Sequence, residues 1–157
     1  MKFYILTSSN LESLKRHNDK EFSGIYKKDT VIVINSLNAQ YVKEATEYCE
    51  SENLEYYITQ SNGTPSKGKN SVFDIFLASD NNYCVLIDGD DFLTAHGVWF
   101  YKHLETLENP PDAVCLMNQT SLRYIDDELY WTNPFTVDYD ELLSLDYYTG
   151  FRELQGL

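Results

Sequence analysis

The chain is poor in basic residues and has no long apolar run. Lysine and arginine together number 12 against 25 aspartates and glutamates, which gives a formal net charge of −13 at pH 7. Because nucleic acids and anionic membranes attract basic surfaces, this imbalance disfavours both as partners. No stretch approaches the roughly 20 apolar residues of a membrane span, and the apolar stretch after Met1 is too short for a signal peptide. We therefore predict a cytoplasmic protein with no membrane span and no nucleic-acid partner.

Cysteine is also scarce. Cys49, Cys84 and Cys115 are odd in number, scattered along the chain and set in apolar or helical surroundings. This pattern argues against a disulfide framework and a zinc site, and it indicates reduced thiols in the core. The chain has 157 residues, of which 43% are hydrophobic, a composition typical of one packed domain. We predict a single domain over 1–157.

Strands and helices are predicted to alternate along the first two thirds of the chain. Short β-branched and aromatic runs predict strands at 3–7, 31–35, 54–59 and 83–88. Helices are predicted at 10–18, 39–52, 70–79 and 94–107 from apolar periodicity and from two N-caps, Asn10 for the first and Thr94 for the last. Turn-forming residues predict a loop at 61–66. This alternation implies an α/β fold, with a mostly parallel central sheet and helices on both faces.

The helices differ in which residues they are expected to bury. The residues predicted to face the core are Tyr41, Val42, Ala45, Tyr48, Cys49, Val72, Phe73, Phe76, Leu77, Val98, Trp99 and Leu104. By contrast, His17, His96 and His103 stand singly on predicted helices, and we predict that they lie on the surface. We find no Ser-His-Asp or Cys-His arrangement, so no catalytic residue is assigned.

The pattern loosens after 107. Strands are predicted at 113–117 and 122–125, an aromatic and polar stretch lies at 130–135, and a weak helix begins at 141 and runs to 145. We accordingly divide the domain into a first part, 1–107, and a shorter second part, 108–157.

Three carboxylates follow the predicted strand at 83–88, in the sequence Asp88-Gly89-Asp90-Asp91. Ligands of open α/β sheets bind at the carboxyl ends of the strands, and carboxylate oxygens suit a hard cation such as Mg²⁺ or Mn²⁺. Asp90 is the expected direct ligand, with Asp88 facing a sugar or ribose hydroxyl or joining the metal. The alternative is a polar turn with no ligand.

Another polar segment, Lys67-Gly68-Lys69-Asn70-Ser71, is predicted at the start of a helix. Backbone N–H groups and two lysines there favour a diphosphate, although an ordinary solvated helix cap is the alternative.

The segment from Gly63 to Lys69 also fits the phosphate-binding-loop pattern G-x-x-x-x-G-K. Against that rival, Asn70 replaces the usual hydroxyl residue, Pro65 is unusual in such a loop, and two βα units precede it. The acidic segment is also similar to the D-x-D nucleophile motif of haloacid-dehalogenase-type phosphatases. That motif belongs on a first strand and needs downstream motifs that we do not find.

In this order, the segments resemble the nucleotide-sugar-binding half of GT-A glycosyltransferases, especially family 2. The resemblance covers about 2–105 and consists of five short motifs, one at each expected strand end or helix start. They are Thr7-Ser8-Ser9-Asn10, Asn35-Ser36, Gln60-Ser61-Asn62-Gly63, Gly68-Lys69-Asn70 and Asp88-Gly89-Asp90-Asp91.

The resemblance implies a Rossmann-like GT-A fold and a site for a nucleoside-diphosphate sugar, with a UDP-sugar favoured. The implied donor-binding residues are Thr7, Ser8, Asn35, Gly63, Lys69, Asn70, Asp88 and Gly89, with Asp90 and Asp88 on the metal. Asn35 replaces the family's aspartate, and an amide donates as well as accepts hydrogen bonds. Lys69 replaces arginine and lacks its two-pronged geometry.

The activity implied is metal-dependent hexosyl transfer to a hydroxyl of a sugar, lipid or protein acceptor. Candidates for a catalytic base are Asp126, Asp127, Asp138, Asp140 and Glu141, and the sequence does not choose among them. Tyr130, Trp131 and Phe135 either contact an acceptor or close a small core. The second hypothesis is a non-catalytic or partner-dependent donor-binding module, and the sequence leaves the oligomeric state open.

Overall fold

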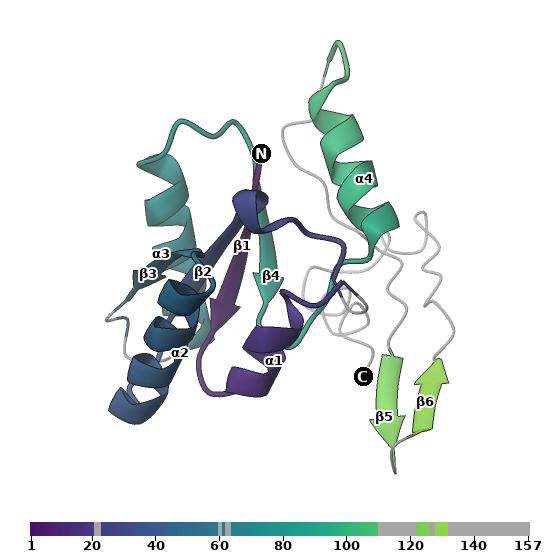
Figure 1. The fold of residues 1–157 in the computed structure, drawn as a ribbon. Coiled ribbons are helices and arrows are strands. Elements are labelled where there is room, and N and C mark those ends of the chain that lie inside the picture. The colour runs from purple at the N-terminus through teal and green to yellow at the C-terminus, as the bar shows by residue number, and fades with distance from the viewer. Residues whose placement is uncertain (21–22, 60, 62–63, 110–121, 126–127, 132–157) are drawn as a thin grey trace, which may run out of the picture. The chain divides into compact units, whose positions relative to one another are not determined.

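The computed structural model describes residues 1–20, 23–59, 61, 64–109, 122–125 and 128–131 (Figure 1). The chain divides into two compact units, Met1–Pro110 and Pro111–Leu157. The single domain over 1–157 stays a prediction.

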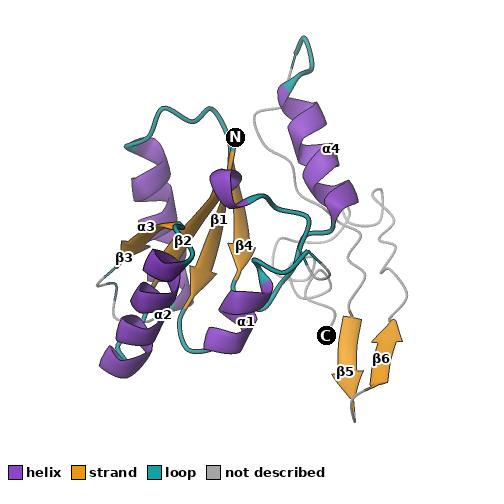
Figure 2. Cartoon of the chain, viewed as in Figure 1, coloured by secondary structure: helices purple, strands orange, loops and turns teal. Residues whose placement is uncertain are grey.

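The first unit contains a four-stranded sheet (Figure 2). Its strands are β1 (Lys2–Thr7), β2 (Thr30–Ile34), β3 (Glu55–Ile58) and β4 (Cys84–Asp88). All neighbouring pairs are parallel, and the order across the sheet is β3-β2-β1-β4. The α/β prediction is confirmed at this level, as a Rossmann-like sheet whose strands alternate with helices.

Four helices connect or follow these strands, as α1 (Leu11–Arg16), α2 (Ala39–Ser51), α3 (Pro65–Leu77) and α4 (Ala95–Glu105). A short 3-10 turn, η1 (Lys27–Asp29), precedes β2. The predicted caps of α1 and α4 are confirmed, because the side chains of Asn10 and Thr94 accept hydrogen bonds from backbone N–H groups of the first turn.

Helices cover both faces of the sheet, as predicted. One face buries Phe3 and Ile5 of β1 beneath Leu14 of α1, Ala45 of α2 and Val98 of α4. The other face has a smaller core. There Tyr4 of β1 and Val31 and Val33 of β2 pack with Val72 of α3. The alternation of Phe3, Tyr4 and Ile5 between the two clusters is the period-two pattern of a strand buried on both faces.

The predictions for α3 and α4 are partly wrong. Phe73, Leu77 and Trp99 are exposed at 47%, 77% and 58% of their surface. The inward face of α3 instead runs through Val72, with Ile75 and Phe76 partly buried against it, so that 73 and 77 point away. Trp99 stacks on neighbouring rings of its own helix, His96 and His103.

The start of α3 is also corrected. The helix begins at Pro65, five residues before 70, with Thr64 at its N-cap. Proline suits the first helical position, because its fixed φ is helical and its missing N–H has no partner there. Pro65 and Ser66 therefore belong to the helix rather than to the predicted loop.

In the second unit, β5 (Leu122–Ile125) and β6 (Glu128–Trp131) form an antiparallel pair. The strand predicted at 122–125 is confirmed. The strand at 113–117, the helix at 141–145, Phe135 and all five candidate base residues lie outside the described residues. Among the described residues, no helix is long and apolar enough to cross a membrane.

Candidate functional site

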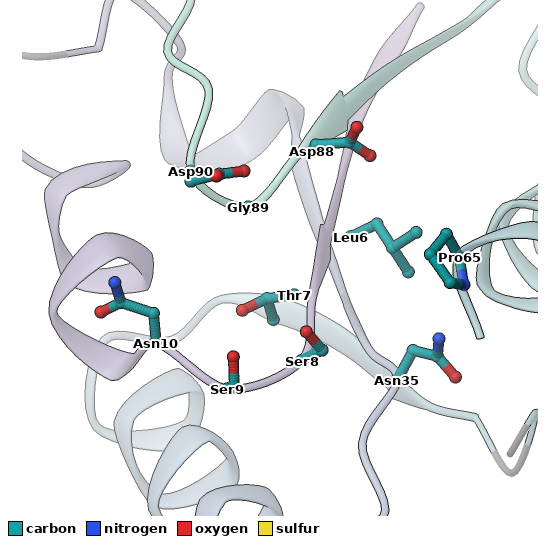
Figure 3. Close-up of a pocket in the computed structure, with 10 residues that line it drawn as sticks. All are labelled: Leu6, Thr7, Ser8, Ser9, Asn10, Asn35, Pro65, Asp88, Gly89 and Asp90. Atoms are coloured by element: carbon teal, nitrogen blue, oxygen red, sulfur yellow. The ribbon is translucent and has the colours of Figure 1, made fainter. Parts of the chain in front are cut away.

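A pocket of about 370 Å³ lies at the carboxyl ends of β1, β2 and β4 (Figure 3). Register brings these ends together, because Leu6 of β1 pairs with Val33 of β2 and Asp88 of β4. The residues that line the pocket are Leu6, Thr7, Ser8, Ser9, Asn10, Asn35, Pro65, Asp88, Gly89 and Asp90. Six of the predicted site residues, from three strand ends, therefore share one cavity.

The acidic segment forms a tight turn against the end of β1. The backbone N–H of Asp91 donates to the carbonyl of Asp88 at 2.9 Å. A Cβ on Gly89 would lie 2.8 Å from the carbonyl oxygen of Leu6 and 3.1 Å from Cβ of Thr7. Only glycine allows this close approach. In Figure 3 the Asp90 carboxylate extends along the turn toward Asp88.

Helix α1 holds this turn from the other side. The Ser13 hydroxyl donates to the carbonyl oxygen of Gly89 at 2.8 Å, and His17 Nε2 lies 3.0 Å from the same oxygen. Because a carbonyl only accepts, Nε2 carries the proton. The His17 ring also packs against Phe92, with ring centroids 4.7 Å apart.

The surface prediction for His17 is wrong, since only 4% of the residue is exposed. Sequence reasoning missed Ser13 altogether. Both lie on one side of the predicted helix, four residues apart, which is a detectable pattern. Their shared partner Gly89 is more than 70 residues away, however, and the residues around Ser13 and His17 do not predict this contact.

Asn35 forms the opposite wall and is 2% exposed. Its Oδ1 accepts hydrogen bonds from the hydroxyls of Thr59, at 3.1 Å, and Ser61. Its Nδ2 donates to the carbonyl of Thr64 at 3.5 Å. An amide nitrogen has two N–H donors, and the carbonyl of Thr64 is the one acceptor that the described residues give it.

The first turns of α3 lie very close to Asn35. A Cβ on Gly68 would be 2.4 Å from Asn35 Nδ2 and 3.1 Å from Cδ2 of Leu6. Glycine at this position therefore lets the amino end of the helix approach the ends of β1 and β2. The approach brings Pro65, the first residue of α3, into the pocket lining.

The remaining predicted donor-binding residues have three different outcomes. Lys69 lies near the acidic turn, with Nζ 3.4 Å from Oδ2 of Asp88. Asn70 is exposed on α3 and does not line the pocket. Gly63 is outside the described residues. Since both Lys69 and Asp88 are nearly half exposed, their ion pair contributes at most about 1 kcal/mol.

Three groups around the pocket have shifted pKa values. Burial lowers the pKa of His17, although its bond to Gly89 and the charge of Asp90 oppose that shift. Partial desolvation and the carboxylates of Asp90 and Asp88 raise the pKa of Asp91. Burial also raises the pKa of Tyr41, whose hydroxyl bonds to that of Thr7.

The acidic turn fits a hard cation that brings further ligands with it. In the described part of the chain, no three His, Cys, Asp or Glu side chains are grouped to hold a metal ion. Asp88 and Asp90 alone flank Gly89 at the pocket. Mg²⁺ and Mn²⁺ bound to phosphates commonly use one or two carboxylates and complete their shell with phosphate oxygens and water.

Comparison with known proteins identifies no family. No protein-family model matches the chain, and no curated protein sequence matches it. The classification that stands is therefore a small α/β domain with a Rossmann-like, four-stranded parallel sheet.

Proposed function

We propose that the chain is a small GT-A-type glycosyltransferase that binds a nucleoside-diphosphate sugar with a divalent cation. It would transfer the sugar, a hexose by resemblance, to an acceptor hydroxyl. The observation that carries this proposal is the meeting of the acidic turn, Asn35 and the amino end of α3 in one pocket. These parts come from three separate strand ends, and each suits a different portion of such a donor.

The acidic turn suits the cation. Asp90 is the proposed ligand, and Asp88 either joins it or accepts a hydrogen bond from a ribose hydroxyl. Bound there, Mg²⁺ or Mn²⁺ would neutralise the negative charge that grows on the leaving diphosphate.

The amino end of α3 suits the diphosphate. Its free backbone N–H groups and the partial positive charge of the helix favour an anion. Pro65 already lines the pocket, and Lys69 lies 3.4 Å from Asp88. A cation on the acidic turn would take over the neutralisation of Asp88, which leaves Lys69 to pair with phosphate.

Asn35 suits the nucleobase as a hydrogen-bond donor. Its Oδ1 already accepts two hydroxyl hydrogen bonds, so its remaining polar contact is an N–H. Uracil and cytosine both carry carbonyl oxygens that accept such a bond. UDP is preferred on resemblance, and CDP is the base comparison that tests the preference.

The start of α3 argues against the phosphate-binding-loop alternative. The residues from Pro65 to Lys69 are the first turns of a helix, whereas that motif needs a loop wrapped around the phosphates before the helix begins. ATP therefore serves as the ligand expected to bind weakly or not at all.

Binding is tested by isothermal titration calorimetry with UDP, UDP-sugars, CDP and ATP, each with and without Mn²⁺. Wild type is compared with Asp90→Ala and with a control of equal charge change, Asp80→Ala, an exposed acid outside the pocket. We expect Mn²⁺-dependent UDP binding that Asp90→Ala abolishes and Asp80→Ala retains. Absence of Mn²⁺-dependent binding to UDP, UDP-sugars and CDP alike overturns the proposal, and tighter binding of ATP favours the phosphate-binding loop.

Transfer is tested separately, with an acceptor panel and with water. Release of UDP together with a glycosylated acceptor supports the transferase. Binding without turnover toward any acceptor or water instead identifies the donor-binding module.

A further inference from the structure

We propose that Ser13 and His17 are positioning residues, which hold the carbonyl of Gly89 and so aim the Asp88 and Asp90 carboxylates at the pocket. The inference rests on the proposed function only for what these carboxylates bind. The claim that Ser13 and His17 hold the turn depends only on their contacts with Gly89.

The Gly89 carbonyl accepts two hydrogen bonds from buried donors, one on α1 and one at the C-cap of that helix. Ser13 Oγ lies 2.8 Å from the oxygen and His17 Nε2 lies 3.0 Å from it, and the two residues are 7% and 4% exposed. Two lone pairs are all that a carbonyl oxygen offers. The peptide group between Gly89 and Asp90 is therefore held at its oxygen from two directions.

The same turn is confined on its opposite side. Gly89 approaches β1 so closely that a Cβ would lie 2.8 Å from the Leu6 carbonyl oxygen. The turn thus lies between β1, which limits its approach, and α1, which anchors its carbonyl. Rotation of that peptide group would break both hydrogen bonds and redirect the Cα–Cβ bond of Asp90, the residue that follows.

Helix α1 is a firm support for these donors. Its Leu14 is 1% exposed in the core cluster, and the N-cap Asn10 accepts from the backbone N–H of Ser13 at 3.0 Å. Asn10 itself lines the pocket. One short helix therefore connects the wall of the pocket, the core and the acidic turn.

Packing alone does not explain a buried histidine at position 17. Its Nδ1 has no hydrogen-bond partner in the described part of the chain, and an unpaired buried polar atom is unfavourable. A leucine would fill the space beside Phe92 without that loss. The Nε2–H bond to Gly89 is what a leucine could not supply.

The first experiment measures the turn without any ligand. The variants are Ser13→Ala and His17→Leu, which remove one donor each, and His17→Gln, whose amide N–H can reach Gly89 again. Lys15→Ala is the matched control, since Lys15 lies on the exposed side of the same helix and pairs with Glu12 rather than with the turn. Circular dichroism and thermal unfolding establish that each variant is folded and give its global stability.

Amide hydrogen exchange at Asp91, which donates to Asp88 at 2.9 Å, reports on the turn. After correction for global stability, we expect exchange about tenfold faster in Ser13→Ala and His17→Leu. His17→Gln should return to within about twofold of wild type, and Lys15→Ala should show no change beyond its global stability. Unchanged exchange in both donor-removing variants overturns the proposal.

The second experiment measures affinity for Mn²⁺ with UDP on the same variants. We expect about tenfold weaker binding in Ser13→Ala and His17→Leu, rescue in His17→Gln and no change in Lys15→Ala. Faster exchange with unchanged affinity contradicts the positioning role. If wild type does not bind Mn²⁺ and UDP at all, the proposed function fails, while the exchange data still decide whether α1 holds the turn.

Discussion

The two sides of the pocket are built in opposite ways. On the β4 side, Asp88, Asp90 and Asp91 crowd one turn, with Lys69 Nζ 3.4 Å from Asp88. On the β2 side, Asn35 carries no charge and is surrounded by hydroxyls and the first turns of α3. The difference suits the ligand that we propose, a nucleoside-diphosphate sugar with a cation at the acidic side and its neutral base at the amide side.

The two sides nevertheless have one structural feature in common. Each has a glycine where an element approaches a neighbouring strand end, Gly89 on the acidic side and Gly68 on the amide side. They differ in what the added Cβ would meet, which is backbone for Gly89 and side chains for Gly68.

The largest effect is expected from Gly89→Ala. The new Cβ meets backbone of β1 that cannot move aside, so we expect a loss of about 3 kcal/mol in the free energy of unfolding. Gly68→Ala is the comparison. Its Cβ meets side chains and alanine favours the helix by about 1 kcal/mol, so its loss should be smaller. Urea unfolding measures both, and a larger loss in Gly68→Ala would contradict this account of the two sides.

The next largest effect is expected from Asn35→Asp, which makes the amide side acidic. The bond from Nδ2 to Thr64 is lost and a carboxylate is buried beside a carbonyl, so we expect a loss of about 2 kcal/mol at pH 7. The loss should shrink toward pH 4, where the introduced carboxyl gains a proton. Asn38→Asp is the matched control, because Asn38 is an exposed N-cap where aspartate serves as well. Equal losses in the two variants would show that burial at Asn35 does not matter.

A smaller effect is expected from Lys69→Met, which removes the cation beside Asp88. Because Lys69 is 43% exposed, stability should change by less than about 0.5 kcal/mol. Affinity for UDP with Mn²⁺ should fall about fivefold, while Mn²⁺ alone should bind more tightly because a nearby like charge is gone. Lys67→Met on the exposed surface of α3 is the control. Calorimetric titration that finds the two lysines equivalent would remove Lys69 from the site.

The smallest effect concerns the pH dependence of stability through His17. Burial lowers its folded pKa below the usual 6.5, so the unfolded chain gains a proton first as the pH falls. The contribution of neutral His17 to the free energy of unfolding is fully present above pH 6.5. It is lost as the pH falls from 6.5 to the lower folded pKa. The pKa of Asp91 is raised in the folded chain, so protonation of this carboxyl increases the free energy of unfolding as the pH falls, which opposes the effect of His17.

The difference between wild type and His17→Gln cancels most of the Asp91 contribution. Unfolding free energies measured from pH 7.5 to 4.5 should therefore fall more steeply for wild type than for His17→Gln. If the free energies of wild type and His17→Gln instead fall equally with pH, His17 is protonated in the folded chain at least as much as in the unfolded chain.

Much of the fold can be predicted because its signals are local. The strands are short apolar runs, and Asn10 and Thr94 cap helices with side chains three residues from their partners. The clustering of Thr7, Asn35 and Asp88 also follows from parallel strands, whose carboxyl ends share one edge. These inferences need only the residues nearby and the general geometry of a parallel sheet.

The errors arise where distant residues decide. Local turn chemistry predicts that Pro65 lies in a loop, although the first turn of a helix also accepts proline. The same helix packs through Gly68 against Asn35, which lies at a strand end distant in the sequence. Sequence reasoning places His17 on the surface because the oxygen that it binds, on Gly89, is more than 70 residues away. The inward prediction for Phe73 and Leu77 fails because apolar spacing alone does not show which side of α3 meets the sheet.

The central place of β1 has a consequence for synthesis on the ribosome. This strand emerges before its two neighbours, and Lys2 pairs with Cys84, about 80 residues later. At about 5–20 residues per second, roughly 4–16 seconds pass before β4 can be added beside it. During that interval β1 and β2 can pair, but the other edge of β1, with its apolar Phe3 to Leu6, stays open to neighbouring nascent chains. The arrangement that brings three strand ends to one pocket therefore makes the growing chain depend on β4, the last strand of this sheet to be synthesised, for protection.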